Sequence, residues 1–222
     1  MKGRLYAVKS IFALLIVCAL MGMFYMNQRK GTAQNPVLDS VMTLEEALEG
    51  LHPDCPKEIK NQQVLIDVTY YGLDQLIHQG QIVLDRDLRQ DIKHVFQIML
   101  KERFPLASVI PVSDPKFRSD RIWDDELSMA QNNTSGFNYR FITGQKKISE
   151  HALGHAIDIN PLFNPYIKGA LVLPTKAVYD MNQSGTLYKG HPVVETFKSL
   201  GWTWGGDWVS LKDYQHFEKE IL

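Results

Sequence analysis

The N-terminal segment divides this chain of 222 residues into two unlike parts. Residues 10–28 carry no charged side chain, and residues 11–26 within them carry no strongly polar one. Nineteen uncharged residues would form a helix about 28 Å long, close to the ~30 Å hydrocarbon core of a bilayer. Lys9 and Arg29 flank this stretch and favour a cytoplasmic N-terminus with an exported body. Residues 1–30 therefore predict a membrane anchor, with a cleavable signal peptide as the alternative.

The part that follows residue 30 has an ordinary globular composition and an acidic balance. Hydrophobic residues make up 45% of the chain and charged residues 22%, which argues against a disordered protein. Residues 1–30 contain five Lys or Arg and no acid, so the remainder holds 19 basic and 25 acidic residues. That balance gives no electrostatic reason to expect a nucleic-acid partner. Two cysteines also exclude a disulfide-dense scaffold and a four-cysteine zinc finger.

A short connecting region separates the apolar segment from the body. Residues 31–42 are polar and weakly patterned, which predicts a tether. Thr43 and Glu46 then have the spacing of a capping box and predict the start of a short helix that ends before Pro53. We therefore expect residues 31–56 to form a tether and a short helix in front of the main domain.

The hydrophobic pattern of the main domain mixes strand and helix periods. From Val64 to Val68 apolar and polar side chains alternate, which is typical of a strand, and a second strand near 80–84 would complete a hairpin. This mixture lacks regular strand–helix–strand repeats and predicts an α+β fold: a small, mostly antiparallel sheet with flanking helices, in one domain over 57–222. Further predicted elements are a strand over 108–112 and helices over 87–100, 120–129 and 191–200, the last ended by Gly201.

The segment from 149 to 161 predicts a pair of converging polar side chains. Residues 155–160 alternate as a strand that turns its isoleucines to the core and Asp158 to a cleft. Gly154 permits a sharp turn before this strand, which would bring His151 back towards Asp158. An imidazole and a carboxylate that meet at one point are plausible zinc ligands, whereas we expect His155 not to be a ligand. A surface histidine and a strand-end aspartate are the alternative.

A second polar group lies near the C-terminus. His216 can supply a third ligand, and Asp213 precedes it by three residues, so a helical turn or bend would bring both to one site. A hydrolytic metal site needs a carboxylate that is not itself a ligand, and this is the role we expect for Asp213. The alternative for this pair is a surface ion pair. Glu218 is the nearest substitute for Asp213.

Two further segments offer contacts for a substrate. Arg140 could hold a carboxylate or stabilise an oxyanion, because its guanidinium presents a rigid fork of donors. A structural salt bridge is the equal alternative. The sequence over 201–208 contains three tryptophans and paired glycines, so Trp204 and Trp208 are candidates for a cleft wall. The alternative is that at least one of these rings packs in the core.

These motifs, taken together and in order, resemble a known family. S-x-H-x-x-G-x-A-x-D, W-G-G-x-W and D-x-x-H-F are similar to motifs of the zinc D-alanyl-D-alanine carboxypeptidases and L-alanyl-D-glutamate endopeptidases. The resemblance implies that His151, Asp158 and His216 bind zinc and that Asp213 is the general base. D-x-x-H resembles the endopeptidase branch, whereas the stretch that ends at Arg140 resembles a carboxypeptidase-like bacterial subgroup.

The resemblance and the N-terminal segment together predict a zinc peptidase that cleaves stem peptides of peptidoglycan. The body would face the periplasm or wall while residues 1–30 hold it to the membrane. The alternative is a catalytically silent module that binds wall peptides on the same fold. The residues expected to catalyse are Asp213 and Arg140, and those expected to contact substrate are Arg140, Ser149, Trp204 and Trp208.

Overall fold

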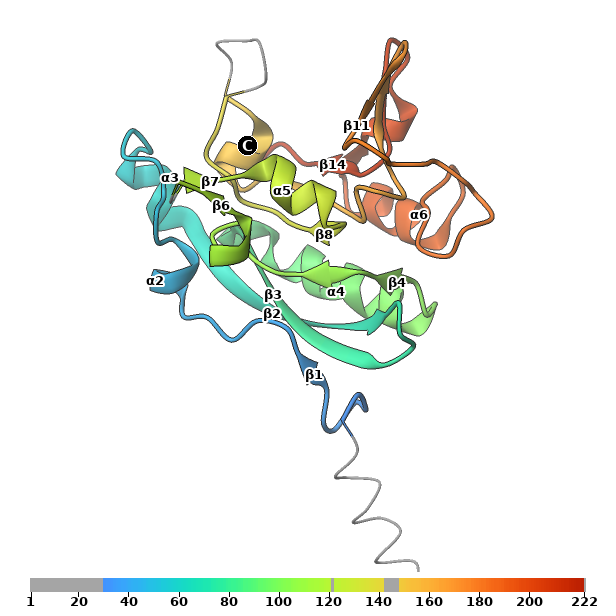
Figure 1. The fold of residues 1–222 in the computed structure, drawn as a ribbon, viewed down its shortest axis with the longest axis horizontal. Helices are drawn as coiled ribbons and strands as arrows, with labels where there is room; N and C mark the ends of the chain where they lie inside the picture. The colour runs from blue at the N-terminus through green and yellow to red at the C-terminus, as the bar shows by residue number, and fades with distance from the viewer. Residues whose placement is uncertain (1–29, 121, 142–147, 222) are drawn as a thin grey trace, which may run out of the picture.

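The computed structural model of this chain describes residues 30–120, 122–141 and 148–221 (Figure 1). The predicted membrane anchor over 1–30 lies outside these described residues, apart from Lys30. Among the residues that are described, none of the helices has the length and apolar character needed to cross a membrane. The predicted domain boundaries stay predictions.

A four-stranded sheet of order β1-β3-β2-β4 forms the base of the molecule. Its centre is the predicted hairpin, in which β2 (Gln63–Gly72) pairs antiparallel with β3 (Ile77–Asp85). The outer strands β1 (Val37–Leu38) and β4 (Pro105–Leu106) pair parallel to β3 and β2. The predicted tether over 31–42 therefore contains a strand, which its weak pattern did not reveal because only two residues pair.

Helix α4 (Arg89–Lys101) packs on one face of this hairpin. Its buried stripe is Ile92, Val95, Phe96 and Met99, which joins the main core cluster with residues of both strands. Each such side chain stabilises the fold by about 1.5–3 kcal/mol through burial. The predicted helix over 87–100 is thus confirmed, although its first turn is the 3₁₀ segment η1 (Arg86–Leu88).

The short helices show where sequence patterns succeed and where they fail. The capping box of Thr43 and Glu46 begins α2 (Leu44–Ala47), as predicted. The helix predicted over 120–129 is wrong in its first half, because the chain there forms a small hairpin. Asp120 has a positive φ of 50° between the two strands, and Asp124 caps the helix by accepting a hydrogen bond from the Leu127 amide. The elements concerned are β6 (Arg118–Ser119), β7 (Ile122–Trp123) and α5 (Asp125–Ala130), and the chain also contains α3 (Lys57–Gln62) and η2 (Pro115–Phe117).

The C-terminal half adds helix α6 (Pro192–Ser199) and two three-stranded antiparallel sheets. Gly201 follows the end of α6 with a φ of 86°, as predicted, and His191 caps its start. One sheet has the order β12-β14-β9 and the other the order β11-β10-β13. Their strands are β9 (Ala156–Asp158), β10 (Tyr166–Lys168), β11 (Leu171–Leu173), β12 (Thr203–Trp204), β13 (Lys212–Asp213) and β14 (His216–Glu218).

The described strands and helices together confirm the predicted α+β fold with mostly antiparallel sheets. A short parallel pair of β5 (Ser108–Val109) and β8 (Asn133–Thr134) completes the strands. The strand predicted over 108–112 is therefore present but shorter. Directly after β8 the chain lies beside β9, where Ser135 and Asp158 form an isolated antiparallel bridge.

Candidate metal centre

Two strands of the β12-β14-β9 sheet place Asp158 and His216 beside each other. They are directly opposed partners in the antiparallel pair of β9 and β14. Ile157 lies on the other face of β9 and is fully buried in the main core, so the alternation of the strand holds Asp158 on the face of the site. The predicted strand at this point is confirmed, although its ladder is limited to Ala156–Asp158.

The third side chain comes from a single turn of 3₁₀ helix, η3 (Glu150–Leu153). Ser149 begins this turn by accepting a hydrogen bond from the His151 amide at 3.3 Å. Gly154 ends it with a φ of 78°, and a Cβ there would lie 2.2 Å from Gln63 Oε1 and 2.7 Å from the Asp85 amide nitrogen. Only glycine fits this turn, which returns the chain into β9 and brings His151 to Asp158 as predicted.

Three donor atoms converge at the resulting site. His151 Nε2 lies 3.2 Å from Asp158 Oδ1 and 3.2 Å from His216 Nδ1, and His216 Nδ1 lies 3.0 Å from Asp158 Oδ1. All three residues are buried, with relative exposures of 4%, 4% and 7%. The group can hold a metal ion, and His155 is not part of it.

The outer nitrogen of each imidazole is occupied by an acceptor. His151 Nδ1 lies 2.7 Å from the Gly136 carbonyl oxygen, and His216 Nε2 lies 3.0 Å from Glu218 Oε2. If each outer nitrogen donates its proton, the inner nitrogen keeps its lone pair for the site. Such outer partners orient metal-binding histidines and make them better ligands. The sequence predicts neither partner, because a backbone carbonyl leaves no mark in it and Glu218 is expected there only as a substitute for Asp213.

The charges of the three groups also suit a shared cation. Burial would raise the pKa of Asp158, but the neighbouring His151 and His216 outweigh it and hold that pKa far below its usual range. Burial would lower the pKa of His216, but hydrogen bonds to Asp158 and Glu218 raise it to about 10. The buried carboxylate therefore demands positive charge beside it. Two imidazoles and one carboxylate are a donor set that zinc accepts while keeping a fourth position open.

Asp213 approaches the site from the other sheet and is not one of the three converging groups. It lies at the end of β13, and Tyr214 and Gln215 form a turn between it and β14, so the predicted bend is present and also carries the chain from one sheet to the other. Burial, together with the Asp158 carboxylate, raises the pKa of Asp213 to about 7, although His216 and His151 oppose the shift. Its Oδ1 atom is buried without a hydrogen-bond partner in the described part of the chain. A carboxylate that titrates near neutral pH can both accept and donate a proton.

Arg140 forms an ion pair, which was the alternative to a catalytic role. Its Nη2 atom lies 2.9 Å from Asp125 Oδ2. The backbone of Arg140 also accepts a hydrogen bond from the Ser149 amide at 3.2 Å, which connects this residue to the start of η3. The predicted role of Arg140 towards substrate stays a prediction.

The remaining predicted contacts divide between core and site. Trp204 is 2% exposed and packs in the main core, where its indole donates to the Tyr214 carbonyl at 2.9 Å. The alternative of a core ring therefore holds for this tryptophan, and its predicted contact with substrate stays a prediction. The Trp208 ring lies 5.5 Å from the His216 ring, beside the site. Ser149 is buried as the cap of η3, where it positions His151.

Comparison with known families agrees with this geometry. Residues 143–219 match a family described as D-alanyl-D-alanine carboxypeptidase. The matched segment contains His151, Asp158, Asp213 and His216, and the match confirms the resemblance predicted from the motifs.

One curated relative that is similar to a short part of this chain is an endopeptidase. The peptidoglycan L-alanyl-D-glutamate endopeptidase CwlK of Bacillus subtilis (strain 168) is 52% identical to this chain over 40 residues. That alignment covers 18% of this chain and 23% of the relative. No solved structure matches this chain significantly.

Proposed function

We propose that this protein is a zinc peptidase that hydrolyses peptide bonds in the stem peptides of peptidoglycan. The observation that carries the proposal is the convergence of His151 Nε2, His216 Nδ1 and Asp158 Oδ1 at one buried point. Asp213, whose pKa lies near neutrality and which is not one of the three donors, supplies the further carboxylate that hydrolysis requires. The matched family and relative support wall peptides as the substrate.

The chemistry divides between the ion and the side chains of this chain. Bound zinc supplies Lewis acidity, which polarises a peptide carbonyl and makes a nearby water more acidic. His151, Asp158 and His216 would hold it, while the Gly136 carbonyl and Glu218 keep the two imidazoles in orientation. Asp213 takes the proton of the attacking water at its carboxylate and then delivers it to the nitrogen of the leaving amine. Arg140 binds or stabilises negative charge on the substrate if it leaves its pair with Asp125.

A location outside the cytoplasm follows from the same proposal. Peptidoglycan lies beyond the membrane, and residues 1–30 have the composition of an export signal that can also serve as an anchor. Protease added from outside should degrade the body of a membrane-bound full-length chain. A mature N-terminus near Gln34 would instead indicate a cleaved signal peptide.

Digestion of purified muropeptides, read by product masses, tests the proposal and identifies the bond that is cut. Loss of a terminal D-alanine would indicate a carboxypeptidase, and cleavage between L-alanine and D-glutamate an endopeptidase. Asp213→Asn is the matched control, because it should keep the metal and lose turnover. Zinc-loaded protein that binds muropeptides and never cleaves them would favour the catalytically silent module.

A further inference from the structure

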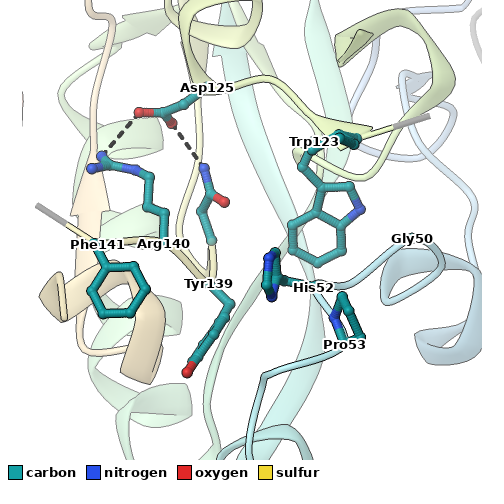
Figure 2. Close-up of a pocket in the computed structure, with 10 residues that line it drawn as sticks. Gly50, His52, Pro53, Trp123, Asp125, Tyr139, Arg140 and Phe141 are labelled. Atoms are coloured by element: carbon teal, nitrogen blue, oxygen red, sulfur yellow. Dashed lines mark hydrogen bonds and ion pairs between the residues drawn. The ribbon is translucent and has the colours of Figure 1, made fainter. Parts of the chain in front are cut away.

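A pocket beside the metal centre shares Arg140 and Asp125 with the mechanism described above, but its aromatic walls have no role there. It has a volume of about 420 Å³, which is within the ~300–1,000 Å³ range of small-molecule sites. The pocket is lined by aromatic residues of three separate segments, and Figure 2 shows Trp123, His52 and Tyr139 along it with Phe141 beyond. The pocket is therefore large enough for a ring-shaped ligand.

The rings of this pocket are held in place by the protein around them. Trp123 donates its indole proton to the Glu49 carbonyl at 2.8 Å and packs edge-on against Phe137 at 6.0 Å between centroids. The Tyr139 and His52 rings lie 6.2 Å apart. Trp123 and Tyr139 also pack on the small core cluster that contains Phe137. A ligand would thus meet ring faces that are already positioned, which reduces the entropy cost of binding.

The polar end of the pocket is nearly neutral. Asp125 accepts one hydrogen bond from Asn138 Nδ2 at 3.1 Å. Asp125 also pairs with Arg140 Nη2 at 2.9 Å, as Figure 2 shows. The pair offers donors and acceptors without a net charge. This suits hydroxyl and amide groups better than a free anion or a purely apolar ligand. A ring with apolar C–H faces and a polar edge combines both requirements, and an amino sugar has that form.

The pocket is connected to the metal centre by one short stretch of chain. The Gly136 carbonyl accepts from His151, the Asn138 amide donates to the His151 carbonyl at 3.0 Å, and Tyr139 and Arg140 follow directly in the pocket wall. At ~3.3 Å per extended residue, Tyr139 lies within about 10 Å of Gly136 along the chain. A ligand in the pocket therefore lies at most about three residues of extended peptide from Gly136, whose carbonyl contacts His151.

We propose that this pocket is a subsite for the amino-sugar ring to which the stem peptide is attached. The inference rests on the proposed function and deepens it, because the position of the sugar limits which bond reaches the metal centre. One amino acid separates the sugar from the bond between L-alanine and D-glutamate. The terminal D-alanyl-D-alanine bond lies three residues further, or about 10 Å along an extended peptide. Four residues separate the sugar from the terminal bond, which is more than the span of about three residues available here, so sugar in this pocket favours the endopeptidase reaction.

Binding of the free sugar tests the subsite without any need for catalysis. The full chain with Asp213→Asn, loaded with zinc in detergent, would be titrated with the methyl amide of N-acetylmuramic acid and followed by calorimetry. The amide leaves the lactyl group uncharged, as it is where the stem peptide is attached. Tyr139→Ala and Phe141→Ala should each weaken binding about five- to tenfold, as expected for losing one ring face. Tyr188→Ala removes a partly exposed ring that does not line the pocket and should leave the affinity unchanged. No saturable binding, or equal binding in all variants, would overturn the proposal.

Turnover separates this proposal from the proposed function. With Asp213 intact, kcat/KM should be higher for a stem peptide that carries its sugar than for the same peptide without it. Tyr139→Ala should reduce this preference for the substrate that carries its sugar about five- to tenfold. Equal turnover of both substrates would reject the subsite while the peptidase stands. Sugar binding without hydrolysis of any muropeptide would reject the peptidase while the sugar site stands.

Discussion

Two clusters of histidine and carboxylate side chains in this molecule have similar composition and opposite geometry. In the metal centre, the inner nitrogens of two imidazoles and one carboxylate oxygen meet at a point. In the second cluster, His78 lies between two carboxylates: its Nδ1 is 2.8 Å from Asp39 Oδ2 and its Nε2 is 3.0 Å from Asp74 Oδ1. Tyr70 also donates its hydroxyl proton to Asp39.

The two clusters differ in whether each imidazole keeps a nitrogen lone pair that a metal ion could use. Both nitrogens of His78 are occupied by acids, so no lone pair is available and the cluster fastens the β1 end of the chain to β2 and β3. In the metal centre each imidazole uses one nitrogen for an outer partner and keeps the other for the site. Convergence of lone pairs, and not the mere presence of histidine and acid, therefore distinguishes a metal site from a structural cluster.

Removing one histidine from each cluster gives the largest expected contrast. His151→Ala should reduce zinc from about one per chain to background and abolish turnover, because two ligands cannot hold the ion. His78→Ala should keep both zinc and turnover. Elemental analysis of the purified variants measures the difference. Full zinc in His151→Ala, or zinc loss in His78→Ala, would break the comparison.

Asp213 tests whether a partly buried acid beside the three donors acts on protons. Asp213→Asn should keep zinc and lower kcat by about 10²–10⁴, the range for losing a positioned acid–base group. Elemental analysis and steady-state rates on muropeptides give the two readouts. Near-normal rates would require another base, and zinc loss would make Asp213 a ligand.

Glu218 tests the outer contacts of the metal centre. Glu218→Gln replaces the charged acceptor 3.0 Å from His216 Nε2 and should weaken zinc binding about 10- to 100-fold. Glu220→Gln is the matched control, because this exposed acid lies two residues further along the chain. Competition with a chelator of known affinity measures the zinc affinity of both variants. Equal zinc affinities in the two variants would show that the outer acid does not tune the ligand.

The smallest effect is expected for the pH dependence of stability at His78. Burial would lower its pKa, but hydrogen bonds to Asp74 and Asp39 outweigh burial and raise the pKa above its ordinary value of ~6.5. Stabilisation is therefore complete below pH ~6.5 and is lost as pH rises through the folded pKa. The pKa of Asp74 is lowered, so its own contribution is lost only in acid.

Urea unfolding of His78→Gln against the wild type measures this contribution. The variant should be less stable by about 1 kcal/mol or less at pH 6, the range of partly exposed ion pairs. The gap should narrow towards pH 9. A gap that is constant with pH would mean that His78 stabilises by packing alone.

The sequence predicts local patterns well and long-range arrangement poorly. The hairpin, α4, α6 and the turn at Gly154 each follow from periods or caps that a short window contains. His151, Asp158 and His216 could be predicted as ligands because their motifs together resemble those of a zinc peptidase family; the spacing of each motif alone also fits surface residues. The pairing of β1 with β3 and the core position of Trp204 depend on residues far away in the chain, which no local pattern reveals.

Asp213 and His216 belong to different sheets, although two residues separate them. The Gln215 carbonyl accepts a hydrogen bond from Ile159 beside β9, whereas Tyr214 donates its amide proton to Pro165 and stacks on Tyr179. The chain thus leaves one sheet and enters the other within these two residues. Substitutions or insertions in the β10–β11 hairpin can therefore alter the position of the Asp213 carboxylate. The β12-β14-β9 sheet, which carries Asp158 and His216, would keep its structure. Substrate preference and metal retention would then evolve as separable traits.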